Sequence, residues 1–183
     1  MIKIISGELR HRKLIEHINK KVRPTQHRVR EAIFNYLRFN DNKNGFLDLF
    51  AGTGAMGIEA ISNGYSFVDF VEKSSDVCLV IKQNIKLLNL KNVNLYHRDY
   101  ADFLYWTTKT YSIIFIDPPY LDIEAYNKSL SIIRQRTILE DKGIVIVETR
   151  RKNQINLEGY EILSEKNYGL TTIFYLTKET DIN

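Results

Sequence analysis

From residue 44 onward the chain alternates between short apolar runs and segments of helical periodicity, and this alternation constrains the fold more than any other feature. The apolar runs have strand length and are continuous, which is typical of parallel strands covered on both faces. They are Phe46–Phe50, Ser66–Val71, Val93–Tyr96, Ser112–Ile116 and Gly143–Val147. Strands and helices that alternate in this way predict a doubly wound, mainly parallel α/β sheet.

The segments between the runs predict helices. The stretch Ala55–Ser62 ends just before Gly64, a residue type favoured at helix C-termini. Ser75 is predicted to cap a helix, because apolar residues recur after it at helical spacing: Val77, Val80, Ile81, Ile85 and Leu88. We expect Cys78 and Trp106 to be packing residues.

The end of the chain predicts an antiparallel pair of strands. The runs Tyr160–Leu163 and Thr171–Leu176 are separated by the turn-like residues Asn167-Tyr168-Gly169, a spacing that suits a hairpin. The sheet should therefore have seven strands. We expect residues 45–178 to form this domain and residues 179–183 to be a tail.

The first 44 residues are interpreted as an extension packed on the core. Ile2–Ile5 and Lys13–Ile15 could pair as a small hairpin, and Pro24-Thr25 should start a helix over Arg28–Phe39. One face of that helix is expected to hold Val29, Ala32, Ile33, Tyr36 and Leu37, with Arg28, Arg30 and Arg38 elsewhere.

This extension carries the whole excess of positive charge. Residues 1–38 hold ten Lys and Arg against three Asp and Glu, a balance of +7, whereas the whole chain has a net charge of +4. Such asymmetry indicates a polyanion partner, most simply a nucleic acid. A solvated basic surface is the alternative.

The sharpest local feature is the glycine-rich turn from Asp48 to Gly57, a G-x-G-x-x-G pattern after a strand and at the start of a helix. Glu72 follows twenty residues after Gly52, so the pattern matches a dinucleotide fingerprint. Asp48, however, would repel a pyrophosphate. It suits S-adenosylmethionine, whose ammonium group Asp48 could bind while Glu72 accepts hydrogen bonds from both ribose hydroxyls. A tight turn without a ligand is the alternative.

Asp99 follows the third run and should lie on the same edge of the sheet. We expect it to accept a hydrogen bond from the adenine amino group, with Phe103 as a ring contact. The alternative is that Asp99 only caps a helix over residues 100–106.

Asp117-Pro118-Pro119-Tyr120 ends the fourth run, where ligands bind in open α/β sheets. The amino group of a base is a poor nucleophile because its lone pair is delocalised into the ring. The carboxylate of Asp117 and the carbonyl of Pro118 could accept hydrogen bonds from its two N–H groups. The prolines would restrict the backbone, so that these acceptors are already in position before the base binds. Tyr120 offers a ring on which an extruded base could stack.

These motifs resemble a known family. DLFAGTGAMGIEA followed by IDPPY resembles the Rossmann-like class I methyltransferases that use S-adenosylmethionine. SGELRHRKL and RPTQHRVREAIFNYL resemble the bacterial 16S rRNA (guanine-N2) methyltransferase family, over about Ile2 to Tyr175. His27 departs from this pattern, because an acidic or small polar residue is common there.

The resemblance implies methyl transfer from S-adenosylmethionine to the exocyclic N2 of a guanine in 16S rRNA or in an assembling small ribosomal subunit. The implied catalytic residues are Asp117, Pro118 and Tyr120. The implied cofactor residues, with their chain neighbours, are Asp48, Phe50, Gly52, Gly54, Glu72, Lys73, Asp99 and Tyr100. The residues expected to face RNA are Arg10, Arg12, Lys13, Arg23, Thr25 and Arg28.

Other classes are disfavoured. One cysteine and four scattered histidines make no zinc site, and no apolar run could span a bilayer or serve as a signal peptide, so we expect a cytoplasmic protein without a metal.

A DNA adenine-N6 methyltransferase would share the Asp117–Tyr120 motif but usually needs a further segment to read DNA. A nicotinamide dehydrogenase has no use for that motif, and a non-catalytic RNA-binding module would not need acidic residues at four strand ends. The run Arg150-Arg151-Lys152 either contacts RNA or forms a solvated loop.

Overall fold

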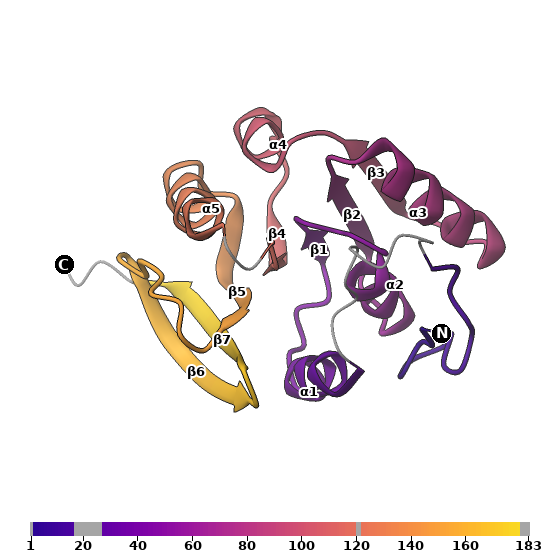
Figure 1. Cartoon of the computed structure of the whole chain (residues 1–183), viewed down its shortest axis with the longest axis horizontal. Coiled ribbons are helices and arrows are strands. Elements are labelled where there is room, and N and C mark those ends of the chain that lie inside the picture. The colour runs from indigo at the N-terminus through magenta and orange to yellow at the C-terminus, as the bar shows by residue number, and fades with distance from the viewer. Residues whose placement is uncertain (1, 17–26, 120–121, 180–183) are drawn as a thin grey trace.

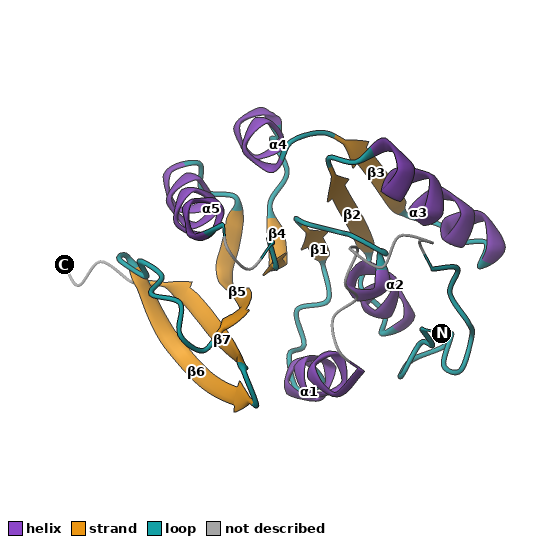
Figure 2. Cartoon of the chain, viewed as in Figure 1, coloured by secondary structure: helices purple, strands orange, loops and turns teal. Residues whose placement is uncertain are grey.

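The computed structural model describes residues 2–16, 27–119 and 122–179, and within them one mixed sheet carries helices on both faces (Figures 1 and 2). The strands are β1 (Gly45–Asp48), β2 (Phe67–Glu72), β3 (Val93–His97), β4 (Tyr111–Ile116), β5 (Leu139–Arg150), β6 (Tyr160–Tyr168) and β7 (Thr171–Lys178). The helices are α1 (His27–Leu37), α2 (Ala55–Ser62), α3 (Ser75–Leu87), α4 (Tyr100–Trp106) and α5 (Ile123–Gln135).

The sheet has seven strands in the order β3-β2-β1-β4-β5-β7-β6. The first five strands in this order are parallel to one another, whereas β7 pairs antiparallel with both β5 and β6. The predicted doubly wound sheet with a C-terminal hairpin is confirmed. Because the chain reverses its direction of winding between β1 and β4, the carboxyl ends of these strands form a crevice where ligands bind in such folds.

Each face of the sheet has its own core, which explains why the strand sequences are continuously apolar. Phe46 and Leu47 are adjacent in β1 and both are fully buried, yet they belong to different clusters. Phe46 packs with residues of α1, α2, α3 and the N-terminal segment. Leu47 packs on the other face with residues of α4 and α5. Figure 1 shows the two groups of helices on opposite sides of the sheet.

The N-terminal segment folds back on itself, as predicted. Lys3 and Lys13 form an antiparallel bridge, and Ile4 N–H donates to the carbonyl of Arg12 over 3.0 Å. Ile2, Ile4 and Leu14 are buried in the same core cluster as α1 and α2. The segment is thus packed on the sheet domain through apolar side chains.

Three predictions for the helices are wrong in detail. Arg30 does not lie away from the apolar face of α1, because it is only 2% exposed and its guanidinium finds a buried carboxylate partner in Glu59. Ser75 is not the cap of α3, since Ser74 occupies that position and Ser75 is already helical. Helix α1 ends at Leu37 rather than at Phe39, which is 85% exposed. The predicted start at Pro24-Thr25 lies outside the described residues.

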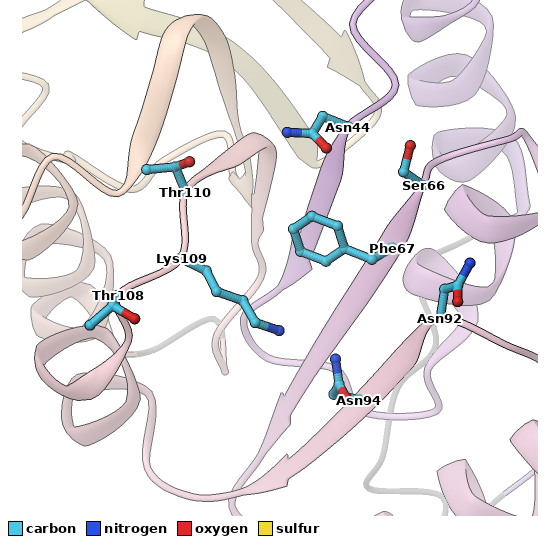
Figure 3. A pocket seen from close by; sticks show the side chains of 8 residues that line it. All are labelled: Asn44, Ser66, Phe67, Asn92, Asn94, Thr108, Lys109 and Thr110. Carbon is cyan, nitrogen blue, oxygen red and sulfur yellow. The ribbon is translucent and has the colours of Figure 1, made fainter.

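A pocket of about 570 Å³ lies at the amino ends of the strands, the edge opposite to the crevice (Figure 3). Its lining consists of Asn44, Ser66, Phe67, Asn92, Asn94, Thr108, Lys109 and Thr110. The ammonium of Lys109 lies 2.8 Å from a carboxylate oxygen of Asp69, which is fully buried. The charge of the lining lysine is therefore neutralised within the protein.

Candidate active site

Four acidic residues follow or end four neighbouring strands of the sheet. Asp48 ends β1 and Glu72 ends β2, whereas Asp99 comes two residues after the end of β3 and Asp117 directly after the end of β4. Because the strand order is β3-β2-β1-β4, the four positions lie side by side along the carboxyl edge. The topology thus brings together the residues that the sequence predicted for cofactor and substrate.

The glycine turn between β1 and α2 depends on three glycines for different reasons. Gly52 and Gly54 have φ angles of 52° and 75°, in the left-handed region that favours glycine. At Gly57 a Cβ atom would lie 2.2 Å from the ring of Phe70 on β2, so a side chain would push α2 away from the sheet. The pattern therefore fixes both the shape of the turn and the close packing of the helix that follows it.

Asp48 lies beneath this turn. Its carboxylate is 1% exposed, and its Oδ2 accepts a hydrogen bond from the backbone N–H of Gly57 over 2.9 Å. Burial raises the pKa of Asp48 to about 7, the bond from Gly57 opposes the rise, and the charge of Glu72 adds to it. A cationic group above the turn would stabilise the ionised form of this carboxylate.

Glu72 links the turn to the next strand. Its Oε2 accepts from Gly52 N–H over 3.0 Å and its Oε1 from Ser74 N–H over 2.8 Å. The side chain is half-buried, so part of it stays accessible from outside the protein. Two backbone donors thus hold the carboxylate in one orientation without consuming its acceptor capacity.

Asp99 caps α4, because its Oδ1 accepts from Ala101 N–H over 2.9 Å. Its Oδ2 lies 3.4 Å from the ammonium of Lys73, which is 81% exposed. The cap interpretation is confirmed, whereas a bond to an adenine amino group stays a prediction. The prediction that Phe103 contacts the adenine ring is wrong, because its side chain is fully buried against Tyr96 and Trp106.

Two aromatic rings of the predicted cofactor set are paired at this edge. The rings of Phe50 and Tyr100 are 4.9 Å apart and both are half-buried. Burial, and then the charges of Asp122, Asp99 and Glu124, raise the pKa of Tyr100 to about 12. Its hydroxyl therefore stays protonated at neutral pH and can donate a hydrogen bond.

The turn after β4 carries the predicted catalytic residues. Asp117 is half-buried, Pro118 is buried and Pro119 is exposed. The carbonyl of Pro119 accepts from Asp122 N–H over 2.8 Å, which ties this turn to the start of α5. Tyr120 lies outside the described residues.

The predicted RNA-facing residues divide in two groups. Arg10, Arg12, Lys13 and Arg28 are exposed, as a phosphate contact requires. Arg23 and Thr25 lie outside the described residues.

Sequence reasoning missed buried acidic residues near the predicted sites. Glu59 of α2 and Glu148 of β5 are each 1% exposed. Glu148 is the next residue after Val147, which pairs with Ile116, so it lies beside Asp117 along the sheet edge. The available signal was a glutamate inside an otherwise apolar element, in AMGIEAIS and in GIVIVETR.

Neither a membrane span nor a metal cluster is found within the described part of the chain. There, no helix is long and apolar enough to cross a bilayer, and no three His, Cys, Asp or Glu side chains gather in a way that could hold a metal ion.

The chain is similar to several known proteins. Residues 2–177 match the family model described as "Conserved hypothetical protein 95". "Ribosomal RNA small subunit methyltransferase D" of Buchnera aphidicola is 35% identical over 84% of this chain and 81% of its own length. "Putative rRNA methyltransferase YlbH" of Bacillus subtilis is 33% identical over 94% and 96% of the two chains. The solved structure "Putative methyltransferase yhhF from Escherichia coli" superposes with a TM-score of 0.86 at 26% identity, over 97% of this chain and 98% of the other.

Proposed function

We propose that the chain, which belongs to the "Conserved hypothetical protein 95" family, is an enzyme that methylates 16S rRNA. The reaction transfers a methyl group from S-adenosylmethionine to the exocyclic N2 of one guanine. The relatives named as rRNA methyltransferases support this substrate class, since they match this chain over most of both lengths. The observation that carries the proposal is the turn Asp117-Pro118-Pro119 beside the acidic ends of β1, β2 and β3.

The residues at the crevice fit S-adenosylmethionine. S-adenosylmethionine supplies an activated methyl group when it is bound. Asp48 offers a carboxylate for the ammonium group, and Glu72, oriented by Gly52 and Ser74, offers acceptors for the ribose hydroxyls. Gly54, Lys73 and Asp99 complete the proposed cofactor set together with the ring pair Phe50 and Tyr100.

Asp117 acts on the target base in this proposal. Its carboxylate and the carbonyl of Pro118 each accept a hydrogen bond from one of the two N–H groups of the guanine amine, which directs the nitrogen lone pair toward the methyl donor. The nitrogen gains positive charge as the bond forms, so the interaction with Asp117 is strongest in the transition state. Pro118 is buried and both prolines restrict the backbone, so the acceptors need no reorganisation.

The N-terminal extension would bind the RNA. Arg10, Arg12, Lys13 and Arg28 are exposed on residues 1–44, and residues 45–178 form the catalytic domain. We place the protein in the cytoplasm, where an assembling small ribosomal subunit is available.

Methyl transfer to small-subunit particles and rRNA from cells that lack this protein tests the proposal. The expected result is one methyl group per rRNA, mapped to the N2 of a single guanine. Asp117→Asn keeps the size of the side chain but removes its charge, so the single-turnover rate should fall by about two orders of magnitude. Asp141→Asn, an exposed carboxylate before the middle of β5, is the matched control. A normal rate in Asp117→Asn would contradict this mechanism, and methylation of DNA adenine instead of rRNA would contradict the substrate.

A further inference from the structure

Glu59 is a buried carboxylate in the middle of α2 to which the N-terminal segment is bound. Its Oε1 accepts from the backbone N–H and the hydroxyl of Ser6, each over 2.7 Å, and its Oε2 accepts from Ile5 N–H over 3.0 Å. The Nε atom of Arg30 in α1 lies 3.4 Å from Oε2 of Glu59. The Nη2 atom of the same guanidinium donates to the carbonyl of Lys3 over 2.6 Å. One buried ion pair therefore joins the N-terminal segment, α1 and α2.

The last turn of α2 adds a second set of contacts. Ser62 Oγ accepts from Leu9 N–H over 3.0 Å and donates to the carbonyl of Ser6 over 2.6 Å. The carbonyl of Ser62 accepts from Glu8 N–H over 2.9 Å. Gly7 has a φ of 74°, and a Cβ there would lie 1.8 Å from the carbonyl oxygen of Ser62. Residues 5–9 are thus hydrogen-bonded to α2 and packed so closely against it that a side chain at Gly7 would push them away.

The same helix also closes the glycine turn. Gly57, in the first turn of α2, donates to Asp48, and Glu59 is only two residues further along. Residues 7–12, which we call the basic tip, carry the exposed Arg10 and Arg12. Helix α2 therefore has the proposed cofactor turn at its first residues and the basic tip at its last residue, Ser62, toward the opposite edge of the sheet (Figure 1).

We infer that Glu59 is a positioning residue for methyl transfer: it holds the basic tip in a fixed place relative to the cofactor turn, so that bound rRNA presents its guanine to Asp117. The inference rests on the proposed function. Glu59 itself is 1% exposed and paired with Arg30, so it contacts neither RNA nor cofactor and acts through the tip. A buried ion pair adds little net stability by itself, but removing one partner leaves an uncompensated buried charge, so the pair strongly favours the arrangement that keeps both partners together.

Glu59→Gln tests the inference with little change in volume. The amide replaces one of two acceptor oxygens by a donor and leaves Arg30 without a counter-charge. We expect kcat/KM for rRNA to fall by about tenfold to a hundredfold, as small misplacements of a substrate do, at a temperature where the variant is folded. The dissociation constant for S-adenosylmethionine should change by less than about twofold, because the turn itself is untouched.

Asp69→Asn is the matched control, because it also removes a buried carboxylate from an ion pair, on the opposite face of the sheet from α2. Both variants should lose stability, but only Glu59→Gln should lose rRNA turnover. Equal losses of turnover in the two variants would reduce Glu59 to a structural residue.

Gly7→Ala provides a second variant should Glu59→Gln fail to fold. It forces the tip away from Ser62 but leaves the ion pair intact, so it should reproduce the loss in kcat/KM. Gly169→Ala is its control, since Gly169 has a φ of 61° in the β6–β7 turn and nothing within 4 Å of a Cβ. A normal kcat/KM in Gly7→Ala would overturn the inference.

A double-mutant cycle with Arg10→Ala and Arg12→Ala isolates the route of action. If Glu59 acts through the tip, Glu59→Gln should have little further effect on kcat/KM once both arginines are gone, whereas additive losses would contradict the inference.

Hydrogen exchange tests the anchoring without any assay of methylation. The amides of Ile5 and Ser6 should exchange faster in Glu59→Gln, while that of Ile15, bound to Asn84 over 2.8 Å, should not. Faster exchange with no rRNA methylation in the wild type would instead place the failure in the proposed function.

Discussion

The substitution Asp48→Asn removes a buried charge directly beneath the glycine turn while keeping an oxygen that can accept from Gly57 N–H. Burial raises the pKa of Asp48 from an ordinary value of 3.8 to about 7. One pKa unit corresponds to about 1.4 kcal/mol, so keeping this carboxylate ionised in the folded protein costs up to about 4 kcal/mol.

The sign of the pH dependence follows from the direction of this shift. Between about pH 4 and pH 7 the folded protein holds a proton on Asp48 that the unfolded chain has released. The contribution of Asp48 to the free energy of unfolding therefore falls as pH rises through this window and is constant above it. Asp48→Asn lacks the titration, so its stability relative to the wild type should increase from pH 4.5 to pH 8 by about 3 kcal/mol. Urea unfolding at a series of pH values measures the difference.

Cofactor binding should respond in the opposite way. Asp48 must be ionised to bind an ammonium group, so the wild-type affinity for S-adenosylmethionine should weaken about tenfold per pH unit below about pH 7. The affinity of Asp48→Asn should be weaker at pH 8 and flat over the same range. Calorimetric titrations at pH 6, 7 and 8 suffice. Parallel pH profiles of the two proteins, in stability and in affinity, would refute the reasoning.

The remaining predictions concern three other contacts. Glu72→Ala should weaken the binding of S-adenosylmethionine by about 1.5–3 kcal/mol, measured by calorimetry, because hydrogen bonds to a charged acceptor are lost; unchanged affinity would contradict its assignment to the ribose. Arg10→Glu together with Arg12→Glu should weaken rRNA binding and reduce the slope of log affinity against log salt by about 1.4, with normal cofactor affinity; an insensitive slope would make the basic segment a solvated surface. Lys109→Met should lower the free energy of unfolding by about 3 kcal/mol in urea titrations, because Asp69 stays fully buried and keeps hydrogen bonds only from Tyr111 and Asn94. Rates of rRNA methylation in Lys109→Met should be normal, since the pocket lies at the far edge of the sheet.

The backbone elements could be predicted because their signals are local. The apolar runs predicted the positions of the strands within a few residues. The turn-like residues Asn167-Tyr168-Gly169 predicted the terminal hairpin formed by β6 and β7. The motifs at Asp48–Gly57 and IDPPY indicated a class I methyltransferase, and SGELRHRKL and RPTQHRVREAIFNYL indicated the rRNA methyltransferase family. The family is confirmed by the match over residues 2–177 and by the named relatives. Elements and motifs depend on neighbours in the chain, which a single sequence displays.

The buried charges could not be predicted in the same way, because their partners are distant in the chain. Arg30 follows Val29 on a helix, and its charge indicated an exposed position until the fold placed Glu59 beside it. Asp69 likewise interrupts an apolar strand, and its partner Lys109 comes forty residues later. The sequence also placed Asp48 correctly at a strand end but did not reveal that its carboxylate points under the turn to Gly57.

The two charged regions of this protein make the position of the basic tip consequential. An RNA phosphate near the crevice is repelled by the carboxylates at the ends of β1 to β4, and at physiological salt charges act only over about 8 Å. Residues 1–38 carry a net charge of +7, and the basic tip within them contacts Ser62 at the end of α2 that lies away from the crevice, so its arginines could attract RNA without facing these carboxylates. Arg30 cannot contribute, because Glu59 neutralises it inside the protein. We infer that the same pair holds Arg10 and Arg12 in place for RNA, so that a charge withdrawn from the surface would position the charges that remain on it.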